Sequence, residues 1–287
     1  AERSVSQILV EKRDALIIDW MAKDLSRFIN SIPVDLPPSF EEEYQRKIQS
    51  LGQNFVPVLI SCHTSHMDGF PLAKVAKIIK EMTNSFLGKD AIKGFVIPIA
   101  ASMETGHQGN IIKAGLDHMH QAVKDDFSLE AVPYVRKKDT EKYGLETNGL
   151  KSMRHIVKQI KDGRGLAVFP EASMQAGRKD EKGKTYGMQE FKDMEGVIKT
   201  VRVARKEPLF IPIGIDGGYR LESPDNNKPT VSYLIETLLT HPSKSRLVRV
   251  KIGLPIDPKE IPAENINDFF GKAVAALLPP EARGVYS

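Results

Sequence analysis

The sequence predicts an α/β fold in which a mixed, mostly parallel central sheet is flanked by helices, with a helical segment at the N-terminus. Short apolar runs recur from residue 56 onward and alternate with stretches of helical periodicity, as in chains built from βαβ units. The apolar runs are hydrophobic at nearly every position, which is typical of strands buried on both faces. Hydrophobic residues make up 41% of the 287 residues and charged residues 27%, the balance of a globular protein.

Strands and helices are expected in alternation. The expected strands are the runs 56–61, 94–100, 130–135, 165–170, 208–215 and 247–252. The expected helices lie near 69–81, 109–124, 147–161, 189–206, 231–239 and 265–278. Because parallel strands present their carboxyl ends at one edge of a sheet, functional residues are expected where these strands end.

The N-terminal region has a different pattern. Residues 4–31 carry apolar side chains at helical spacing, with charges of both signs between them. Their balanced charge predicts weak attraction to anionic lipid, so packing onto the protein is favoured, and contact with a membrane stays an alternative. The prolines of 32–40 predict a linker. The chain therefore divides into an N-terminal helical segment and linker, 1–40, and an α/β domain, 41–287.

Composition and charge narrow the classes of function. The single cysteine, Cys62, favours a reducing compartment, which predicts a cytoplasmic protein. No apolar run in the sequence approaches the ~20 residues of a spanning helix. The net charge of +4 is too small to indicate nucleic acid as a partner. Basic clusters at 136–138, 178–184 and 199–206 are either solvated faces or sites for an anionic substrate or lipid headgroups.

The stretch SCHTSHMDGF, residues 61–70, concentrates titratable side chains directly after an expected strand. His63 follows that strand and Asp68 lies where a helix is expected to begin, so the two side chains can meet across the turn. An imidazole is a good general base near neutral pH, and a carboxylate on its other nitrogen fixes the tautomer and stabilises the imidazolium. The nucleophile would then be a substrate hydroxyl. Alternatively, Asp68 merely caps the following helix.

A zinc site is the third interpretation of this stretch. His63, His66 and Asp68 are all possible ligands. The di-metal hydrolase pattern H-x-H-x-D-H, however, needs histidine where Thr64 and Gly69 stand. We therefore expect no metal at this turn.

Other catalytic and nucleotide-binding motifs are not matched. The segment GRKDEKGKT, 177–185, resembles a P-loop but has five residues between its glycines where four are required. No G-x-S-x-G nucleophile elbow occurs anywhere in the sequence. Cys62 adjoins His63, but neighbouring residues of a strand face opposite sides, which disfavours a Cys–His nucleophile pair.

Four sequence blocks, taken in order, resemble those of the glycerolipid acyltransferases, the family of glycerol-3-phosphate and 1-acylglycerol-3-phosphate acyltransferases. The first, HTSHMD at 63–68, is similar to the family's H-x-x-x-x-D block. The others are VPYVRKK at 132–138, VFPEASMQAGR at 168–178, where F-P-E-G-T-R is typical, and LFIPIGIDG at 209–217. The resemblance covers about 56–217 of the chain.

This resemblance implies roles for several residues. His63 would take the proton of an acceptor hydroxyl, Asp68 would orient His63, and Glu171 would position the acceptor. Arg136 and its neighbour Lys137 would hold the acceptor's phosphate, a task for which a planar guanidinium is suited.

Further substrate contacts would come from Ser65 and from backbone amides near Gly69, which would stabilise the oxyanion. The third block departs from the family, because Ala172 replaces its glycine and Met174 stands where arginine is usual. Arg178 is the nearest substitute for that arginine. The fourth block would close the floor of the pocket.

The predicted function is transfer of a fatty acyl group from an acyl thioester, on coenzyme A or acyl carrier protein, to a hydroxyl of glycerol-3-phosphate or 1-acylglycerol-3-phosphate in phospholipid synthesis. We expect no cofactor beyond the thioester as co-substrate, and at most a peripheral contact with the inner face of the membrane. Two alternatives stay open. One is a zinc-dependent hydrolase that uses His63, His66 and Asp68, and the other is a non-catalytic lipid-binding protein.

Overall fold

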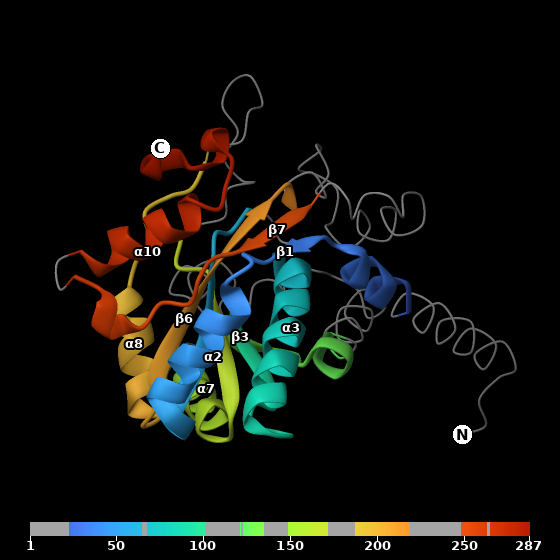
Figure 1. The fold of residues 1–287 in the computed structure, drawn as a ribbon, viewed down its shortest axis with the longest axis vertical. Helices are drawn as coiled ribbons and strands as arrows, with labels where there is room; N and C mark the ends of the chain where they lie inside the picture. Colours follow the sequence, from blue (N-terminus) through green and yellow to red (C-terminus); the bar gives the residue numbers. More distant parts are fainter. Residues whose placement is uncertain are drawn as a thin grey trace, which may run out of the picture.

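The computed structural model describes residues 23–64, 68–100, 121, 123–134, 149–171, 187–218, 248–262 and 265–287. At their centre is a seven-stranded sheet in the order β1-β7-β6-β2-β5-β3-β4 (Figure 1). The strands are β1 (Val34–Asp35), β2 (Phe55–Ser61), β3 (Gly94–Ala100), β4 (Leu129–Tyr134), β5 (Arg164–Val168), β6 (Glu207–Asp216) and β7 (Arg249–Ile252). All neighbouring strands in this sheet are parallel except β6 and β7. The predicted mixed, mostly parallel sheet is therefore confirmed.

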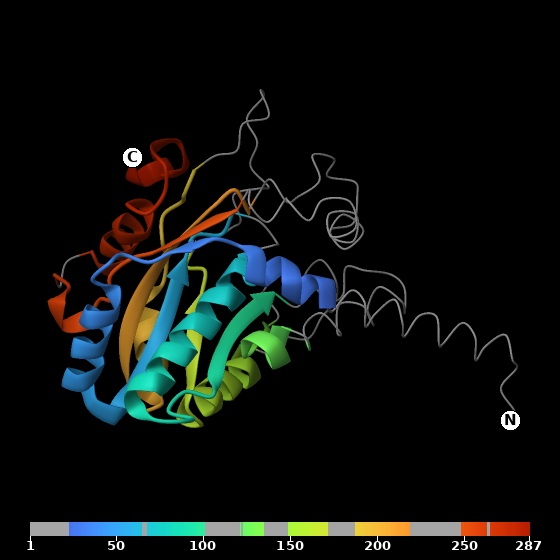
Figure 2. The same cartoon turned by 45° about the vertical axis from the view of Figure 1, so that its right-hand side comes forward.

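Helices cover both faces of the sheet. They are α2 (Phe40–Leu51), α3 (Gly69–Leu87), α7 (Gly149–Lys161), α8 (Met194–Val203) and α10 (Ile266–Ala275), with single 3₁₀ turns η1 (Gly52–Asn54), η6 (Pro258–Glu260), η7 (Pro280–Ala282) and η8 (Gly284–Tyr286). On one face, α2 and α3 are joined by a 2.7 Å hydrogen bond between the hydroxyls of Tyr44 and Thr83. On the other face, α8 contacts both α7 and α10 (Figures 1 and 2). This is the expected three-layer α/β arrangement.

The position of β2 and β6 inside the sheet explains why their sequences are almost continuously apolar. β2 is buried at every position, and β6 is buried at all positions except its ends. Both strands lie inside the sheet with helices over each face, so neither face is left for polar side chains. β7 lies next to the edge strand and alternates exposed and buried residues.

The described part of the N-terminal segment belongs to the same core. Residues 23–31 are helical, and Leu25 and Ile29 are buried in the apolar cluster that includes the sheet. The ammonium of Lys74 in α3 donates to two carbonyl oxygens where this helix ends. A cation there satisfies carbonyl groups that lack helical partners. The stretch 32–40, expected as a linker, contains β1, which pairs with β7.

Helix α2 was not expected from the sequence. Its buried residues include only three large apolar or aromatic side chains, Phe40, Tyr44 and Ile48, and its first turn is acidic. The spacing of four between these side chains places them on one face of the helix. This narrow apolar stripe is enough to bury the inner face of α2, because the long aliphatic stem of Lys47 completes the buried surface.

The expected helix at 189–206 is shorter in the structure, where α8 begins only at Met194. Asp193, the residue before it, has φ 59°, in the left-handed region. A helix cannot continue through that conformation. Residues 187–193 are instead irregular and form backbone hydrogen bonds with other segments of the chain. Most of the expected helix 109–124 and all of 231–239 lie outside the described residues.

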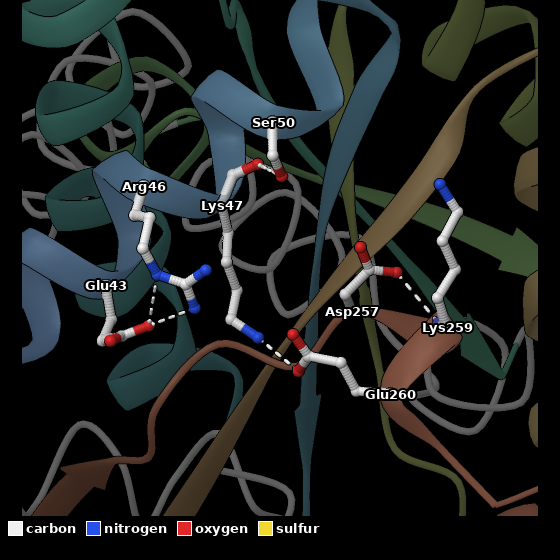
Figure 3. A network of polar contacts seen from close by, with 7 residues as sticks. All are labelled: Glu43, Arg46, Lys47, Ser50, Asp257, Lys259 and Glu260. Atoms are coloured by element: carbon white, nitrogen blue, oxygen red, sulfur yellow. Dashed lines mark hydrogen bonds and ion pairs between the residues drawn. The ribbon is translucent and has the colours of Figure 1, made fainter.

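A polar network ties α2 to the C-terminal part of the chain (Figure 3). Lys47 is buried, and its ammonium binds the carboxylate of Glu260 in η6. Beside it, the guanidinium of Arg46 donates to Glu43 at 2.7 Å. Asp257 caps η6 by accepting a backbone amide proton. The network joins elements that are 213 positions apart in the sequence.

Among the helices that the structure describes, none combines the length and the hydropathy that crossing a bilayer requires.

Candidate active site

The candidate site lies where β2 and β5 end beside each other. The two strands are parallel neighbours, with Ile60 opposite Val168. His63 and Glu171 each come three residues after these partners, so the strand register brings both to the same edge of the sheet. The chain leaves β2 through α3 toward β3, but leaves β5 through α8 toward β6, in the opposite direction along the sheet. Such a switch point is where open α/β sheets bind their ligands.

His63 and Asp68 form a hydrogen-bonded pair. Nδ1 of His63 lies 3.1 Å from Oδ2 of Asp68. An ionised carboxylate can only accept, so Nδ1 carries the proton and Nε2 is left as the basic nitrogen. The Asp68 side chain is 0% exposed, whereas 25% of the His63 side chain is exposed. The imidazole therefore borders both the protein interior and solvent, as a general base for an external substrate must.

The carboxylate of Asp68 is held by the turn and does not cap the helix. Asp68 directly precedes α3, but its side chain makes no capping hydrogen bond. Instead, it accepts from the backbone amide of Thr64 and, at 2.7 Å, from the hydroxyl of Thr64. Thr64 is 4% exposed. The interpretation of Asp68 as a mere helix cap is therefore wrong, and the bonds to Thr64 fix its carboxylate against His63.

A second contact holds the imidazole from its face. The rings of His63 and Phe169 are stacked, with centroids 4.5 Å apart and planes inclined by 14°. Phe169 directly follows β5, so the strand that leads to Glu171 also supplies a wall for His63. The bond at the ring edge and the contact on the ring face together restrict both torsions of the histidine, which is how a catalytic side chain is pre-oriented.

Glu171 and Asp68 both lie close to the buried thiol of Cys62. Glu171 is 7% exposed and Cys62 is 0% exposed. Burial raises the pKa of Cys62, and the negative charges of Glu171 and Asp68 raise it further. The thiol donates to the carbonyl oxygen of Ile215 at 3.7 Å. Cys62 is thus held as a neutral thiol, which argues against a cysteine nucleophile here.

The chain around Glu171 is fastened by C-terminal residues that the sequence analysis missed. Glu171 forms an antiparallel bridge with Phe191. The amide of Phe191 donates to the hydroxyl of Tyr286 at 2.8 Å, and the amide of Val285 donates to the carbonyl oxygen of Met188 at 3.0 Å. Burial raises the pKa of Tyr286, so its hydroxyl stays protonated. No pattern in the sequence links positions 95 residues apart.

The structure accounts for the other predicted site residues in part. Gly69 is the first residue of α3, so amides without a helical partner lie next to the His63 turn. The fourth sequence block is β6, the parallel neighbour of β2. β4 ends at Tyr134, at the same edge of the sheet as the ends of β2 and β5. The predicted residues outside the described part of the chain are Ser65, His66, Arg136, Lys137 and Arg178.

Within the described ranges, no group of three or more His, Cys, Asp and Glu side chains could hold a metal ion. His63 and Asp68 are bonded to each other. His66, the third ligand of the zinc interpretation, is not among the described residues. The zinc interpretation therefore stays an alternative.

Comparison of the chain with models of known protein families gives no match, and comparison with curated proteins gives no significant match. The fold and the site define the class of protein on their own. It is an α/β protein with a His–Asp pair, whose carboxylate is buried, and a second buried carboxylate, Glu171, at the switch point of its sheet.

Proposed function

We propose that this protein is an O-acyltransferase that moves a fatty acyl group from an acyl thioester to a hydroxyl of a glycerol phosphate acceptor. The observation that supports it most is the 3.1 Å bond between His63 and Asp68, whose carboxylate is buried and held by Thr64. A histidine in this state removes a proton from a hydroxyl. The resemblance of four sequence blocks to the glycerolipid acyltransferases suggests that the hydroxyl is the acceptor's own.

In the proposed reaction, Nε2 of His63 takes the proton of the acceptor hydroxyl while its oxygen attacks the carbonyl carbon of the thioester. Asp68 stabilises the imidazolium that forms. The C–S bond then breaks and His63 returns the proton to the leaving sulfur, so the products are an ester and a free thiol. Amides at the start of α3, near Gly69, would donate to the oxyanion, and each such donor contributes about 3–4 kcal/mol in favourable enzymes.

The substrates follow from the same resemblance. Glu171 would position the acceptor hydroxyl, and Arg136 with Lys137 would bind its phosphate, with Arg178 and Ser65 as further substrate contacts. The acceptor would be glycerol-3-phosphate or its 1-acyl form, and the donor a thioester of coenzyme A or acyl carrier protein. The reaction would need no further cofactor and would serve phospholipid synthesis in the cytoplasm, in peripheral contact with the membrane.

Thiol release from an acyl thioester, measured with and without glycerol-3-phosphate, tests this proposal. The protein should release thiol in step with ester formation, and only when the acceptor is present. His63→Ala should lower turnover by ~100-fold or more, the scale of a lost general base. His155→Ala, at an exposed histidine of α7, is the matched control and should keep its turnover.

Three outcomes would contradict the proposal. Undiminished turnover in a folded His63→Ala variant would remove the general base. Release that needs no acceptor and is abolished by a chelator would indicate a zinc-dependent hydrolase. Fatty acid binding without any thioester cleavage would indicate a lipid-binding protein.

A further inference from the structure

Helix α7 presents an outer face that is rich in positive charge. The helix contains no acidic residue, and it buries Ser152, Ile156 and Ile160 along one side. The helical period of 3.6 places Lys151, Arg154 and Lys158 on the opposite side, where all of them are exposed. We call the exposed surface formed by Leu150, Lys151, Arg154 and Lys158 the α7 face.

The cations of the α7 face have no carboxylate partner among the residues that the structure describes. Three carboxylates of neighbouring elements, in β4, α8 and β6, are engaged by other cations. These ion pairs are Glu130 with Lys124 and with Arg164, each at 3.4 Å, Glu195 with Lys199 at 3.3 Å, and Glu207 with Arg202 at 3.4 Å. The positive charge of the α7 face is therefore left to attract an anionic partner from outside.

An apolar side chain accompanies this charge. Leu150, in the first turn of α7, is 78% exposed. The hydroxyl of Ser152 donates to the carbonyl oxygen of Pro133 in β4 at 2.8 Å, which fixes the first turn of α7 near the end of that strand. β4 ends at the same edge of the sheet as the strands that carry His63 and Glu171. The exposed leucine thus lies at the edge of the sheet that holds the candidate site.

We propose that the α7 face binds the anionic surface of a lipid bilayer, with Leu150 entering the headgroup region. Anionic headgroups attract each lysine or arginine that approaches them, and lysine stems reach such a surface while their ammonium groups stay hydrated. The composition fits a protein partner less well. Helix α7 contains no aromatic residue, whereas the cores of protein interfaces are enriched in aromatic residues and depleted in lysine.

This inference rests on the proposed function in one respect: a glycerolipid made at the site would leave into the bilayer next to it. The binding itself needs no turnover. A vesicle assay without substrate therefore separates a failure of this inference from a failure of the proposed reaction, and His63→Ala should bind vesicles as well as the unaltered protein does.

The test is co-sedimentation of the whole chain with vesicles of phosphatidylcholine, with and without phosphatidylglycerol. We expect binding that needs phosphatidylglycerol and weakens as salt is added. The double variant Lys151→Glu/Lys158→Glu should lower the partition coefficient by about 25-fold or more, from about fivefold for each cation. Leu150→Ser should lower it by roughly threefold or more through lost apolar burial.

A matched control changes the same charge elsewhere. Lys89 and Lys93 are exposed between α3 and β3, at the edge of the sheet opposite the site. Lys89→Glu/Lys93→Glu should leave vesicle binding within about twofold of the unaltered protein. If both double variants lost vesicle binding equally, the effect would depend only on the net charge of the protein, and the proposal would be overturned. Absence of vesicle binding would also overturn it. So would a result in which the α7 face is needed for binding an acidic protein, such as acyl carrier protein, but not for binding vesicles.

Discussion

At the scale of single residues, the orientation of His63 depends on side chains that are not expected to touch a substrate. Asp68 lies where it would be read as a helix cap, yet its oxygens face His63 and Thr64. Phe169 stacks on the same imidazole from the next strand. Each contact restricts a torsion of the imidazole, so a base at this position would be pre-organised for the proposed reaction.

Thr64→Val tests the part that Thr64 plays. Valine keeps the size and β-branching of threonine but removes the hydroxyl that donates to Asp68 at 2.7 Å. Hydrogen bonds to charged groups contribute about 1.5–3 kcal/mol, so kcat/KM for acyl transfer should fall by ~10-fold or more. Thr64→Ser keeps the hydroxyl and should keep most of the activity. Equal losses in both variants, with unchanged thermal midpoints, would mean that the hydroxyl does not orient Asp68.

The sequence is sufficient to predict the His63–Asp68 pair because both residues belong to one short turn, so no long-range information is needed. Glu171 could be singled out through the resemblance of its block, but the stacking of Phe169 on His63 was not predicted. The role of Thr64 could not be predicted, since a threonine inside a turn has no distinguishing pattern. Tyr286 could not either, because its bond to Phe191 depends on how the end of the chain folds back over residues 187–191.

At the scale of helices and strands, the Lys47–Glu260 pair fastens α2 to η6 (Figure 3). The two side chains differ in environment, with Lys47 8% exposed and Glu260 52% exposed. The hydrogen bond from Lys47 holds the pKa of Glu260 below its ordinary value. A carboxyl with a lowered pKa stabilises the fold above its unfolded pKa, about 4.3. That contribution is lost as the pH falls through the folded pKa.

Glu260→Gln should therefore lower the free energy of unfolding at neutral pH, by about 1 kcal/mol because solvent screens the half-exposed carboxylate. The difference from the unaltered protein should be full above the unfolded pKa of about 4.3 and should close below it, as the pH falls through the lowered pKa of folded Glu260. Urea unfolding at a series of pH values measures it. Glu207→Gln, in the exposed pair with Arg202, is the control and should change stability by less than ~0.5 kcal/mol. A gap between Glu260→Gln and the unaltered protein that persists at low pH would contradict this account.

Some boundaries of helices and strands are set by the local sequence pattern, and others by contacts with distant parts of the chain. The strands β2 and β6 could be predicted to within about a residue because burial on both faces makes them apolar throughout. Helix α2 could not, since its apolar stripe is narrow and Lys47 completes it. Residues 189–193 were predicted as part of a helix, but bonds from this segment to Pro170 and to the C-terminal residues hold it in an irregular conformation.

At the scale of the whole molecule, the strand order creates a site from two residues that are far apart in sequence. His63 and Glu171 lie at the same edge of the sheet because β2 and β5 are neighbours, although two strands separate β2 and β5 along the chain. The alternation of strands and helices could be predicted to give a mostly parallel sheet. The neighbour relations could not, because parallel strands joined by helices are compatible with several orders, and the choice depends on packing over the whole core.

Cys62 lies at the centre of this arrangement, directly after β2 and 0% exposed. It is the chain's single cysteine, so any alkylating reagent that modifies a thiol of this protein must reach that position. The reagent needs an exposed thiolate, and native proteins expose such groups only through opening reactions. We expect iodoacetamide to label Cys62 at least ~10³-fold more slowly in the native protein than in denaturant. Mass spectrometry of timed samples measures this ratio, and labelling at the rate of the unfolded chain would contradict it. The labelling rate of Cys62 thus measures how often the core next to His63 opens, without an attached dye or an engineered label.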